Sequence, residues 1–279
     1  MKIVKYLSLL LVVMLSVSCE KHTIQFDAES IGNKAEFQIA YYVPVTSASA
    51  NNITKVEING QMFANNKAPL NTYNAIPSGA TGRFFVVDPG NISVKMYQGA
   101  DMATLVYDRN VTVNTGKQNL VVHSFTEDPV VFDNGFPYTP VVTEQTDSTA
   151  WVKFYNFLYE TAGVKTALRL QYQYLDSRTS AVVNIGAPVS FGETTGWIPV
   201  TVVKTDLVSA GSRTITFKIK TVDANGNIIA DLQVIGTSGS YSAYTGTATL
   251  AIGRRYHQTM AGFRASSTAT SSVRSFTAL

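Results

Sequence analysis

The residues of this sequence that could carry out chemistry are few: one cysteine, Cys19, and three histidines, His22, His123 and His257. A zinc site needs three or four Cys, His or acidic ligands. The histidines lie far apart and form no HExxH or His-x-His pattern. We therefore expect no metal site, and we expect His123 and His257 to be strand residues with a local hydrogen-bond partner.

Other signatures of catalysis or cofactor binding are also missing from the sequence. There is no Gly-x-Ser-x-Gly elbow of the serine hydrolases, and there is no P-loop or dinucleotide fingerprint. Glycoside hydrolysis needs two carboxylates about 5–10 Å apart, and the spacing of Glu160, Asp176, Glu193 and Asp206 carries no such signal. The sequence predicts a protein that is not an enzyme and holds no cofactor.

One acidic segment is similar to a calcium-binding loop. Asp223-Ala224-Asn225-Gly226-Asn227 is followed by Asp231. The glycine stands fourth rather than sixth, and no bidentate glutamate closes the segment, so the EF-hand register fails. A hairpin turn explains the segment better.

Aromatic side chains are the feature with the most functional promise. Exposed rings stack on sugars and anchor protein interfaces, because they offer a large apolar area at low entropic cost. We take Trp197, Tyr172 and Tyr174 as candidate ligand-binding residues, and the alternative is that such rings form the sheet core. They belong to a cluster in the second half of the chain: Trp151, Tyr155, Tyr159, Tyr172, Tyr174, Trp197, Tyr241 and Tyr244.

The N-terminal segment has the pattern of a secretory signal. Lys2 and Lys5 precede an apolar run from Leu7 to Val17, which is the arrangement of a cleavable signal peptide. A membrane-spanning helix needs about 20 apolar residues, so this run is too short to span. The signal peptide is expected to comprise residues 1–18.

The end of this signal resembles the lipobox of bacterial lipoproteins. The run closes with Leu15-Ser16-Val17-Ser18-Cys19, in which Ser16 replaces the usual leucine. The resemblance implies cleavage before Cys19 and a diacylglycerol on its thiol. Because Cys19 is the only cysteine, it cannot close an intramolecular disulfide. The alternative is a free thiol after an ordinary signal peptide.

Lipidation of Cys19 would anchor the protein to a membrane, with residues 19–33 as a lipidated tether. We expect the outer membrane, and Glu20-Lys21-His22 leaves open whether the protein faces the cell surface or the periplasm. The whole chain has a formal net charge of +3. Cleavage would remove Lys2 and Lys5, so the mature chain would be nearly neutral. Nucleic-acid binding needs a concentrated basic patch, and the sequence does not indicate one.

Alternation of apolar and polar residues predicts an all-β fold. Charged residues make up 15% of the chain, below the roughly 25% of ordinary soluble domains. In Thr214–Lys220, Ile215, Phe217 and Ile219 share one face, as in a strand with one wet side. Turn sequences such as Asn59-Gly60 separate the expected strands. These are Glu36–Tyr41, Lys55–Asn59, Arg83–Val87, Asn91–Met96, Asn110–Val113, Leu120–Phe125, Trp151–Phe157, Thr214–Lys220, Thr247–Ile252 and Gln258–Phe263.

One segment is ambiguous between strand and helix. Phe154, Phe157, Leu158, Thr161, Val164 and Leu168 have near-helical spacing, which would allow a short helix over residues 153–170. Gly163 and the β-branched and aromatic neighbours favour a strand instead.

The body of the chain shows signs of an internal repeat. Thr81-Gly82-Arg83 resembles Thr195-Gly196-Trp197, and in each half a late strand carries a histidine, His123 or His257. An alignment through Gly82 and Gly196 places Trp197 where Arg83 stands, so the indole should face solvent. The predicted organisation is β-sandwich domain 1 at 34–126, a linker rich in proline at 127–149, and β-sandwich domain 2 at 150–279.

A lipobox followed by two such β modules resembles a family of Bacteroidota surface lipoproteins with paired Ig-like domains. The resemblance covers residues 35–263 through turn motifs, and the first copy lacks the aromatic residue after Gly82. It implies two consecutive Ig-like or transthyretin-like β-sandwiches and carries little about activity. A more distant resemblance is to fimbrillin-like lipoproteins, whose two transthyretin-like domains polymerise.

These observations lead to two functional hypotheses. The first is a non-enzymatic cell-envelope lipoprotein that binds a glycan or an envelope protein, in adhesion or recognition. The second is a structural subunit or anchor of a surface fibre. Asp147-Ser148-Thr149 also resembles a Bacteroidota O-glycosylation site, which makes Ser148 a candidate for modification.

Overall fold

The computed structural model describes residues 32–77, 84–133, 149–176, 179–202 and 211–278. Cys19, Arg83 and Ser148, on which three of the expectations rest, lie outside these residues. The described chain confirms the all-β prediction: apart from the 3-10 turn η1 (Ser49–Asn51), every regular element is a strand.

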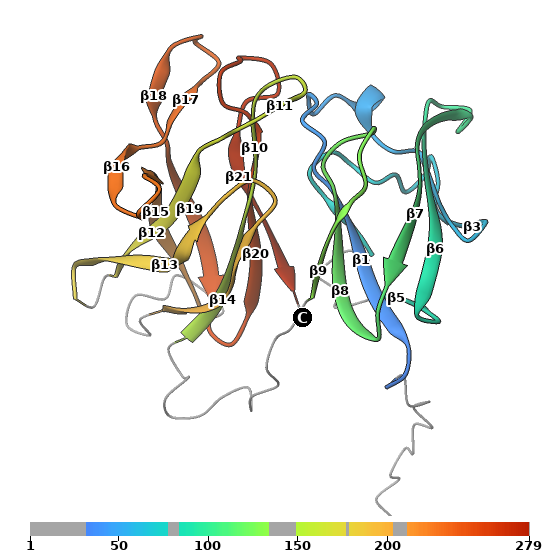
Figure 1. Ribbon diagram of the computed structural model, residues 1–279, viewed down its shortest axis with the longest axis horizontal. Helices are drawn as coiled ribbons and strands as arrows, with labels where there is room; N and C mark the ends of the chain where they lie inside the picture. The colour runs from blue at the N-terminus through green and yellow to red at the C-terminus, as the bar shows by residue number, and fades with distance from the viewer. Residues whose placement is uncertain (1–31, 78–83, 134–148, 177–178, 203–210, 279) are drawn as a thin grey trace, which may run out of the picture. The chain divides into compact units, whose positions relative to one another are not determined.

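The first half of the described chain forms a β-sandwich (Figure 1). The β1 sheet has the strand order β4-β1-β8-β9, with β5 also paired to β1, and the facing β6 sheet has the order β3-β2-β6-β7. The strands are β1 (Ala35–Tyr41), β2 (Lys55–Ile58), β3 (Gln61–Ala64), β4 (Ala75–Ile76), β5 (Phe85–Val87), β6 (Gly90–Gln98), β7 (Thr104–Val113), β8 (Gly116–Val122) and β9 (Val130–Asp133).

The second half forms another sandwich. The β10 sheet has the order β11-β10-β20-β21 with β14 paired to β10, and the β15 sheet has the order β13-β12-β15-β16 with β19 paired to β15. The strands are β10 (Thr149–Thr161), β11 (Val164–Lys165), β12 (Arg169–Asp176), β13 (Ala181–Val189), β14 (Thr194–Thr201), β15 (Ser212–Val222), β16 (Ile228–Asp231), β17 (Gln233–Ile235), β18 (Tyr241–Ala243), β19 (Thr245–Ala251), β20 (Arg255–Phe263) and β21 (Ser272–Ala278).

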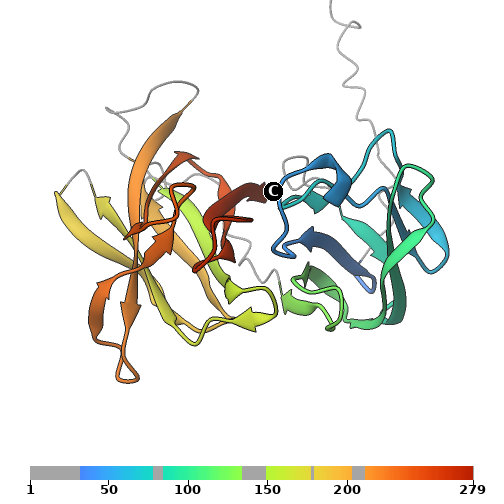
Figure 2. The same cartoon turned by 90° about the horizontal axis from the view of Figure 1, so that it is seen from above.

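Each sandwich has its own apolar core, and both follow from side-chain alternation. Phe37 and Ile39 of β1 meet Ile92, Val94 and Met96 of β6 in the first core. The second core joins the β10 and β15 sheets through side chains that include Phe154, Leu158, Tyr172, Ile215, Phe217 and Ile219. Figure 2 shows the two groups of strands, blue to green and yellow to red.

The two halves share one plan of strand pairing. In each, the first strand pairs in parallel with a late strand, β1 with β8 and β10 with β20. An antiparallel strand then follows at the edge, β9 or β21. The parallel pairs begin with matching hydrogen bonds, since the N–H of Gly116 donates to the carbonyl of Lys34 and that of Gly253 to the carbonyl of Thr149.

This plan corrects the expected alignment of the two halves by one residue. Ala35 pairs with Val87, and its counterpart Ala150 pairs with Val200. Val87 and Val200 are therefore equivalent positions. Trp197 precedes Val200 by the same number of residues as Phe84 precedes Val87, so Trp197 corresponds to Phe84 rather than to Arg83. His123 and His257 lie at different distances from the glycines that open their strands, so they are not equivalent positions.

Strand β10 settles the ambiguous segment against the helix. It runs from Thr149 to Thr161 and is buried along nearly its whole length. Phe154 and Leu158 enter the second core, whereas Phe157 enters a different cluster on the opposite face. Because both faces of this strand are covered, apolar residues follow one another without alternation and mimic helical spacing.

Two turns behave as their sequences predict. Asn59 and Gly60 have φ of 51° and 79°, the conformation that a two-residue type I′ hairpin requires between β2 and β3. In the acidic segment, Asp223 Oδ1 accepts the backbone N–H groups of Asn225 and Asn227, at 2.9 and 2.8 Å. That carboxylate therefore closes the hairpin between β15 and β16.

The expected linker at 127–149 contains a strand. β9 (Val130–Asp133) pairs with β8 at the edge of the β1 sheet. Residues 134–148 of that span lie outside the described part.

Candidate functional site

The outer faces of the β1 and β10 sheets pack against each other, and we call this contact the seam. A third apolar cluster fills it, separate from the two sandwich cores. It contains Ala40, Tyr42, Tyr73 and Val121 from the first half, and Tyr155, Phe157 and Ala261 from the second. Tyr155, one of the aromatic residues that the sequence offers for recognition, is thus used to join the two halves.

Strand β9 contributes the central ring of the seam. Phe132 meets the Tyr155 ring edge-on, with centroids 4.9 Å apart, and contacts Phe157 at 6.1 Å. Edge-to-face pairs of this kind stabilise a contact beyond the area they bury. A further link is the guanidinium of Arg274, which lies over the Tyr73 ring at 4.3 Å.

A buried polar group, His257, lies beside this aromatic cluster. Its Nδ1 is 2.7 Å from the Tyr155 hydroxyl, and Phe276 stacks on the ring with a centroid distance of 4.8 Å. Burial and the nearby Lys153 lower the pKa of His257 to about 3, because low dielectric disfavours the charged form. The imidazole is therefore neutral at physiological pH.

Lys153 is itself buried on the same face of the β10 sheet. Its Nζ donates a 2.6 Å hydrogen bond to the backbone carbonyl of Asp133, so this ammonium group ties β10 to β9. Burial lowers the pKa of Lys153 to about 8. The closed surroundings leave this cluster no access to a substrate.

An open groove of about 290 Å³ lies at one end of the seam, and we call it the seam groove. The loop after β8 forms one wall with His123, Ser124, Thr126 and Glu127, and Tyr159 of β10 lies across from it. Apolar parts come from Val43, Pro44, Phe125, Phe263 and the Ala162-Gly163 turn. A concave site with apolar walls and a few convergent polar groups is the usual form of a ligand pocket.

His123 and Tyr159 form the polar pair at the base of this groove. His123 Nδ1 lies 2.9 Å from the Tyr159 hydroxyl, and that hydroxyl also donates to the His123 carbonyl at 3.3 Å. Phe157 stacks on the imidazole with centroids 5.4 Å apart. Burial lowers the pKa of His123 and raises the pKa of Tyr159, so both side chains are neutral near pH 7.

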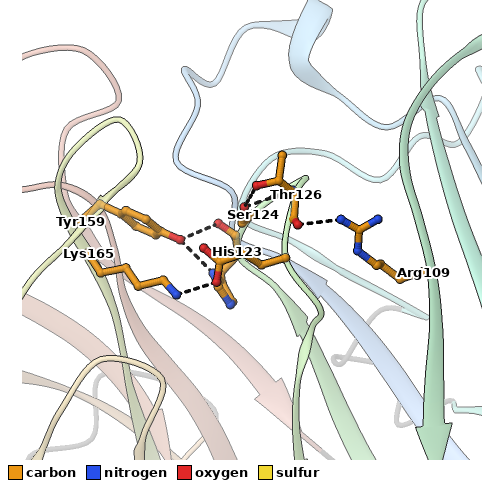
Figure 3. Close-up of polar contacts among 7 residues, drawn as sticks. Arg109, His123, Ser124, Thr126, Tyr159 and Lys165 are labelled. Atoms are coloured by element: carbon orange, nitrogen blue, oxygen red, sulfur yellow. Dashed lines mark hydrogen bonds and ion pairs between the residues drawn. The ribbon is translucent and has the colours of Figure 1, made fainter.

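Hydrogen bonds and ion pairs hold the loop of the groove from both halves, as Figure 3 shows. From β7, Arg109 donates to the Thr126 carbonyl at 2.6 Å. From β11, Lys165 pairs with Glu127 at 2.5 Å. The Ser124 and Thr126 hydroxyls are 3.1 Å apart. The polar groups are therefore preorganised, which lowers the entropic cost of binding.

Comparisons with known proteins do not identify a family. No protein-family model matches the chain, and no curated protein shows detectable sequence similarity. Among solved structures, the chain is similar to the Bacillus anthracis TIE protein at 10% identity and a TM-score of 0.24, covering 82% of this chain and 34% of that chain. The chain thus spans about a third of the length of that structure.

Tyr172 and Tyr174 lie in the core rather than on a surface. Tyr172 is fully buried, its ring stacks on Phe217 at 4.8 Å, and its hydroxyl donates to Gln258 Oε1. Tyr174 is also buried in the second core. Alternation along β12 turns both rings into the core, so neither offers an exposed aromatic face to a ligand. Tyr174 nevertheless also lies against an open groove on the outer face of the β15 sheet.

Trp197 lies on the seam face of the β10 sheet, opposite the core. It pairs in register with Lys153, and its ring contacts His257 with centroids 4.9 Å apart. The indole is half-buried. The indole points away from the second core, but it packs against buried His257 and does not face open solvent as the alignment with Arg83 suggested. Its role in binding stays a prediction.

The residues of the seam groove were not recognised as a site from the sequence. His123 was expected to have a local partner, yet Tyr159 lies far along the chain and on another sheet. Only the tertiary packing brings Glu127 to Lys165. In the described residues no group of His, Cys, Asp and Glu could hold a metal ion. Within those same ranges, no helix has the length and apolar character to cross a membrane.

Proposed function

We propose that this protein is a non-enzymatic binding module of the bacterial cell envelope, tethered through Cys19, and that it holds a glycan in the seam groove. The observation that carries the proposal is the groove itself, with preorganised polar groups and apolar walls at the junction of two sandwiches. Hydroxyl and imidazole groups can donate to or accept from sugar hydroxyls, and the Glu127 carboxylate accepts from them. The apolar parts of Pro44 and Phe263 suit the C–H face of a sugar ring.

Binding fits the ionisable groups of the groove better than catalysis does. Glu127 is engaged by Lys165, so one of its oxygens is already occupied by an ion pair that fixes the side chain. The pKa of Tyr159 is raised by burial, so its hydroxyl remains a neutral hydrogen-bonding group and a weak nucleophile. The groove thus presents fixed donors and acceptors.

The proposal is tested by glycan binding to the full chain in detergent micelles. The chain is screened against an array of envelope and host glycans, and each hit is measured by calorimetry. Glu127→Gln should weaken a genuine hit by roughly tenfold, the usual effect of losing a charged hydrogen-bond partner.

The matched control is Glu57→Gln. Glu57 accepts from Tyr97 and pairs with Lys55 on the β6 sheet, far along the chain from the groove residues. This substitution should leave the affinity unchanged. An array without hits, or equal affinities for both variants and wild type, would contradict the proposal.

The second candidate function is a subunit or anchor of a surface fibre. One observation favours it: β21 is an edge strand that pairs with β20 and places Val273 and Phe276 against the second sandwich and the seam. Edge strands can pair with another chain. A fibre subunit should give ladders on unboiled gels, and a protein that stays monomeric at all concentrations would exclude this role.

A further inference from the structure

The outer face of the β15 sheet carries a second open groove, of about 260 Å³. Alternation along β12 and β15 turns the aromatic residues of these strands inward and the intervening side chains outward. The lining side chains include Gln173, Leu175, Val182, Thr216, Lys218 and Lys220. This groove belongs to neither core and lies on the sheet that faces away from the seam.

The apolar part of the groove is exposed to solvent. Leu175 and Val182 pair across β12 and β13, and they are 50% and 65% exposed. Two adjacent aliphatic side chains on an otherwise polar sheet face form a small apolar platform, of the size that the C–H face of one sugar ring can cover.

Next to this platform lies a pair of amides. Gln173 Nε2 donates to Asn184 Oδ1 at 2.7 Å. Each amide carries an oxygen acceptor and two N–H donors. Gln173 is only 6% exposed, whereas Asn184 is exposed, so the Asn184 N–H groups are the ones open to a ligand. Sugar hydroxyls and carboxylates can accept from these N–H groups.

The charge of the groove is positive. Lys220 pairs with Asp231 at 2.6 Å, whereas Lys218 is exposed and has no ion pair with any residue that the structure describes. Arg169, at the start of β12, donates to the backbone carbonyls of Asp223 and Ala224, so its guanidinium is also engaged. Lys220 and, after it, Lys218 lower the pKa of Asp231. Lys218 nevertheless makes no ion pair with a described residue, so its ammonium group is open to solvent beside the amides and the platform.

We propose that this groove binds an acidic polysaccharide. A carboxylate of the sugar pairs with Lys218, a neighbouring hydroxyl accepts from Asn184, which Gln173 holds in place, and the ring lies on Leu175 and Val182. Charge complementarity selects an acidic chain over a neutral glycan or an apolar peptide. This site is independent of the seam groove, so either can fail without the other.

The test measures binding of oligogalacturonate, an oligomer of a uronic acid, to the full chain in detergent micelles by calorimetry. Binding should weaken as salt is added, because charge pairs at a surface are screened. The methyl-esterified oligomer, which lacks the charge, should bind roughly tenfold more weakly or not at all.

Variants then locate the site. Lys218→Gln should weaken oligogalacturonate binding by roughly tenfold, whereas the matched control Lys67→Gln, at an exposed lysine of the β3 hairpin region, should not. Glu127→Gln in the seam groove should also leave it unchanged. No binding of the acidic oligomer, equal binding of the esterified one, or equal affinity of Lys218→Gln and wild type would each overturn the proposal.

Discussion

Two ionisable residues, His257 and Lys153, occupy the covered face of the β10 sheet. His257 is 1% exposed, and its Nε2 has no hydrogen-bond partner among the described residues. Its Nδ1 is used by Tyr155. Protonation would place an uncompensated charge between aromatic rings, beside the ammonium of Lys153, and this is the physical cause of the lowered pKa.

We predict that the free energy of unfolding falls as the pH drops from about 6.5 towards 3. The folded pKa of His257 is about 3, below the ordinary value of about 6.5. Between these values the unfolded chain binds a proton that the folded chain does not, so stability falls by about 1.4 kcal/mol per pH unit. Above pH 6.5 this contribution is complete.

The measurement is urea unfolding of wild type and His257→Gln between pH 7 and 5. Carboxylates titrate mostly at lower pH, so they contribute little in this range. The wild type should lose more stability than the variant across it. Parallel pH profiles for the two proteins would show that another group carries the dependence.

Gly246 illustrates a second constraint at the scale of one residue. A Cβ at this position would overlap the Phe217 ring, which stacks on Tyr172 in the second core. We expect Gly246→Ala to destabilise the protein by about 1–3 kcal/mol, the cost of overpacking a core. Gly236→Ala is the control, because a Cβ there meets no atom within 4 Å. Thermal unfolding of both variants checks the prediction. Gly246→Ala should lower the unfolding temperature clearly more than Gly236→Ala does, and equal unfolding temperatures would contradict it.

At the scale of elements, how much the sequence predicts depends on how many faces of a strand are covered. β15 has one solvent-exposed face, so Ile215, Phe217 and Ile219 alternate with polar residues. This alternation allows the strand to be predicted from the sequence. β10 has two covered faces, so its apolar residues run together and permit a helical interpretation. Whether the aromatic residues of β12 are buried or exposed was ambiguous for a related reason. Tyrosine occurs both in sheet cores and on exposed faces, so the residue type alone does not decide between them.

The seam could not be predicted from the sequence, for a different reason. The pairs His123–Tyr159 and Tyr155–His257 join residues far apart in the chain, and no local pattern marks them. The repeat was visible in its turns, but a one-residue slip through Gly82 and Gly196 misplaced Trp197. Because a one-residue slip exchanges the two faces of a sheet, that alignment could not by itself decide which face Trp197 occupies.

We predict that Phe132→Ala weakens the attachment of β9 to the second half. The variant loses the edge-to-face contact with Tyr155 and should cost at least about 1 kcal/mol in unfolding free energy. Hydrogen exchange should show faster exchange in β9 and at the seam face of β10. Val131→Ala, at a 36% exposed neighbour, is the control and should change neither. Unaltered exchange in Phe132→Ala would show that Phe132 does not hold the seam.

At the scale of the whole molecule, the proposed envelope role depends on the N-terminal anchor. We predict that Cys19→Ala abolishes lipidation, because the thiol is the only attachment point for the diacylglycerol. The wild-type protein should partition into the detergent phase in Triton X-114 separation and yield a mature chain beginning at Cys19 in mass spectrometry. A variant that is still processed at the same bond and still fractionates with membranes would exclude the lipoprotein assignment.

The parallel pairing of first and late strands has a mechanical consequence for a protein held at a surface. If a ligand pulls on the far end of either sandwich while the anchor holds the near end, the load acts along β1 against β8, or along β10 against β20. The ladders span Ala35–Tyr41 with Gly116–Val122 and Trp151–Tyr159 with Arg255–Phe263. Strands pulled in opposite directions along their axes must break such a ladder in shear, with its hydrogen bonds loaded together rather than one by one. Forced unfolding is governed by the unfolding rate under load. Each sandwich should therefore unfold slowly when flow or cell movement pulls on it.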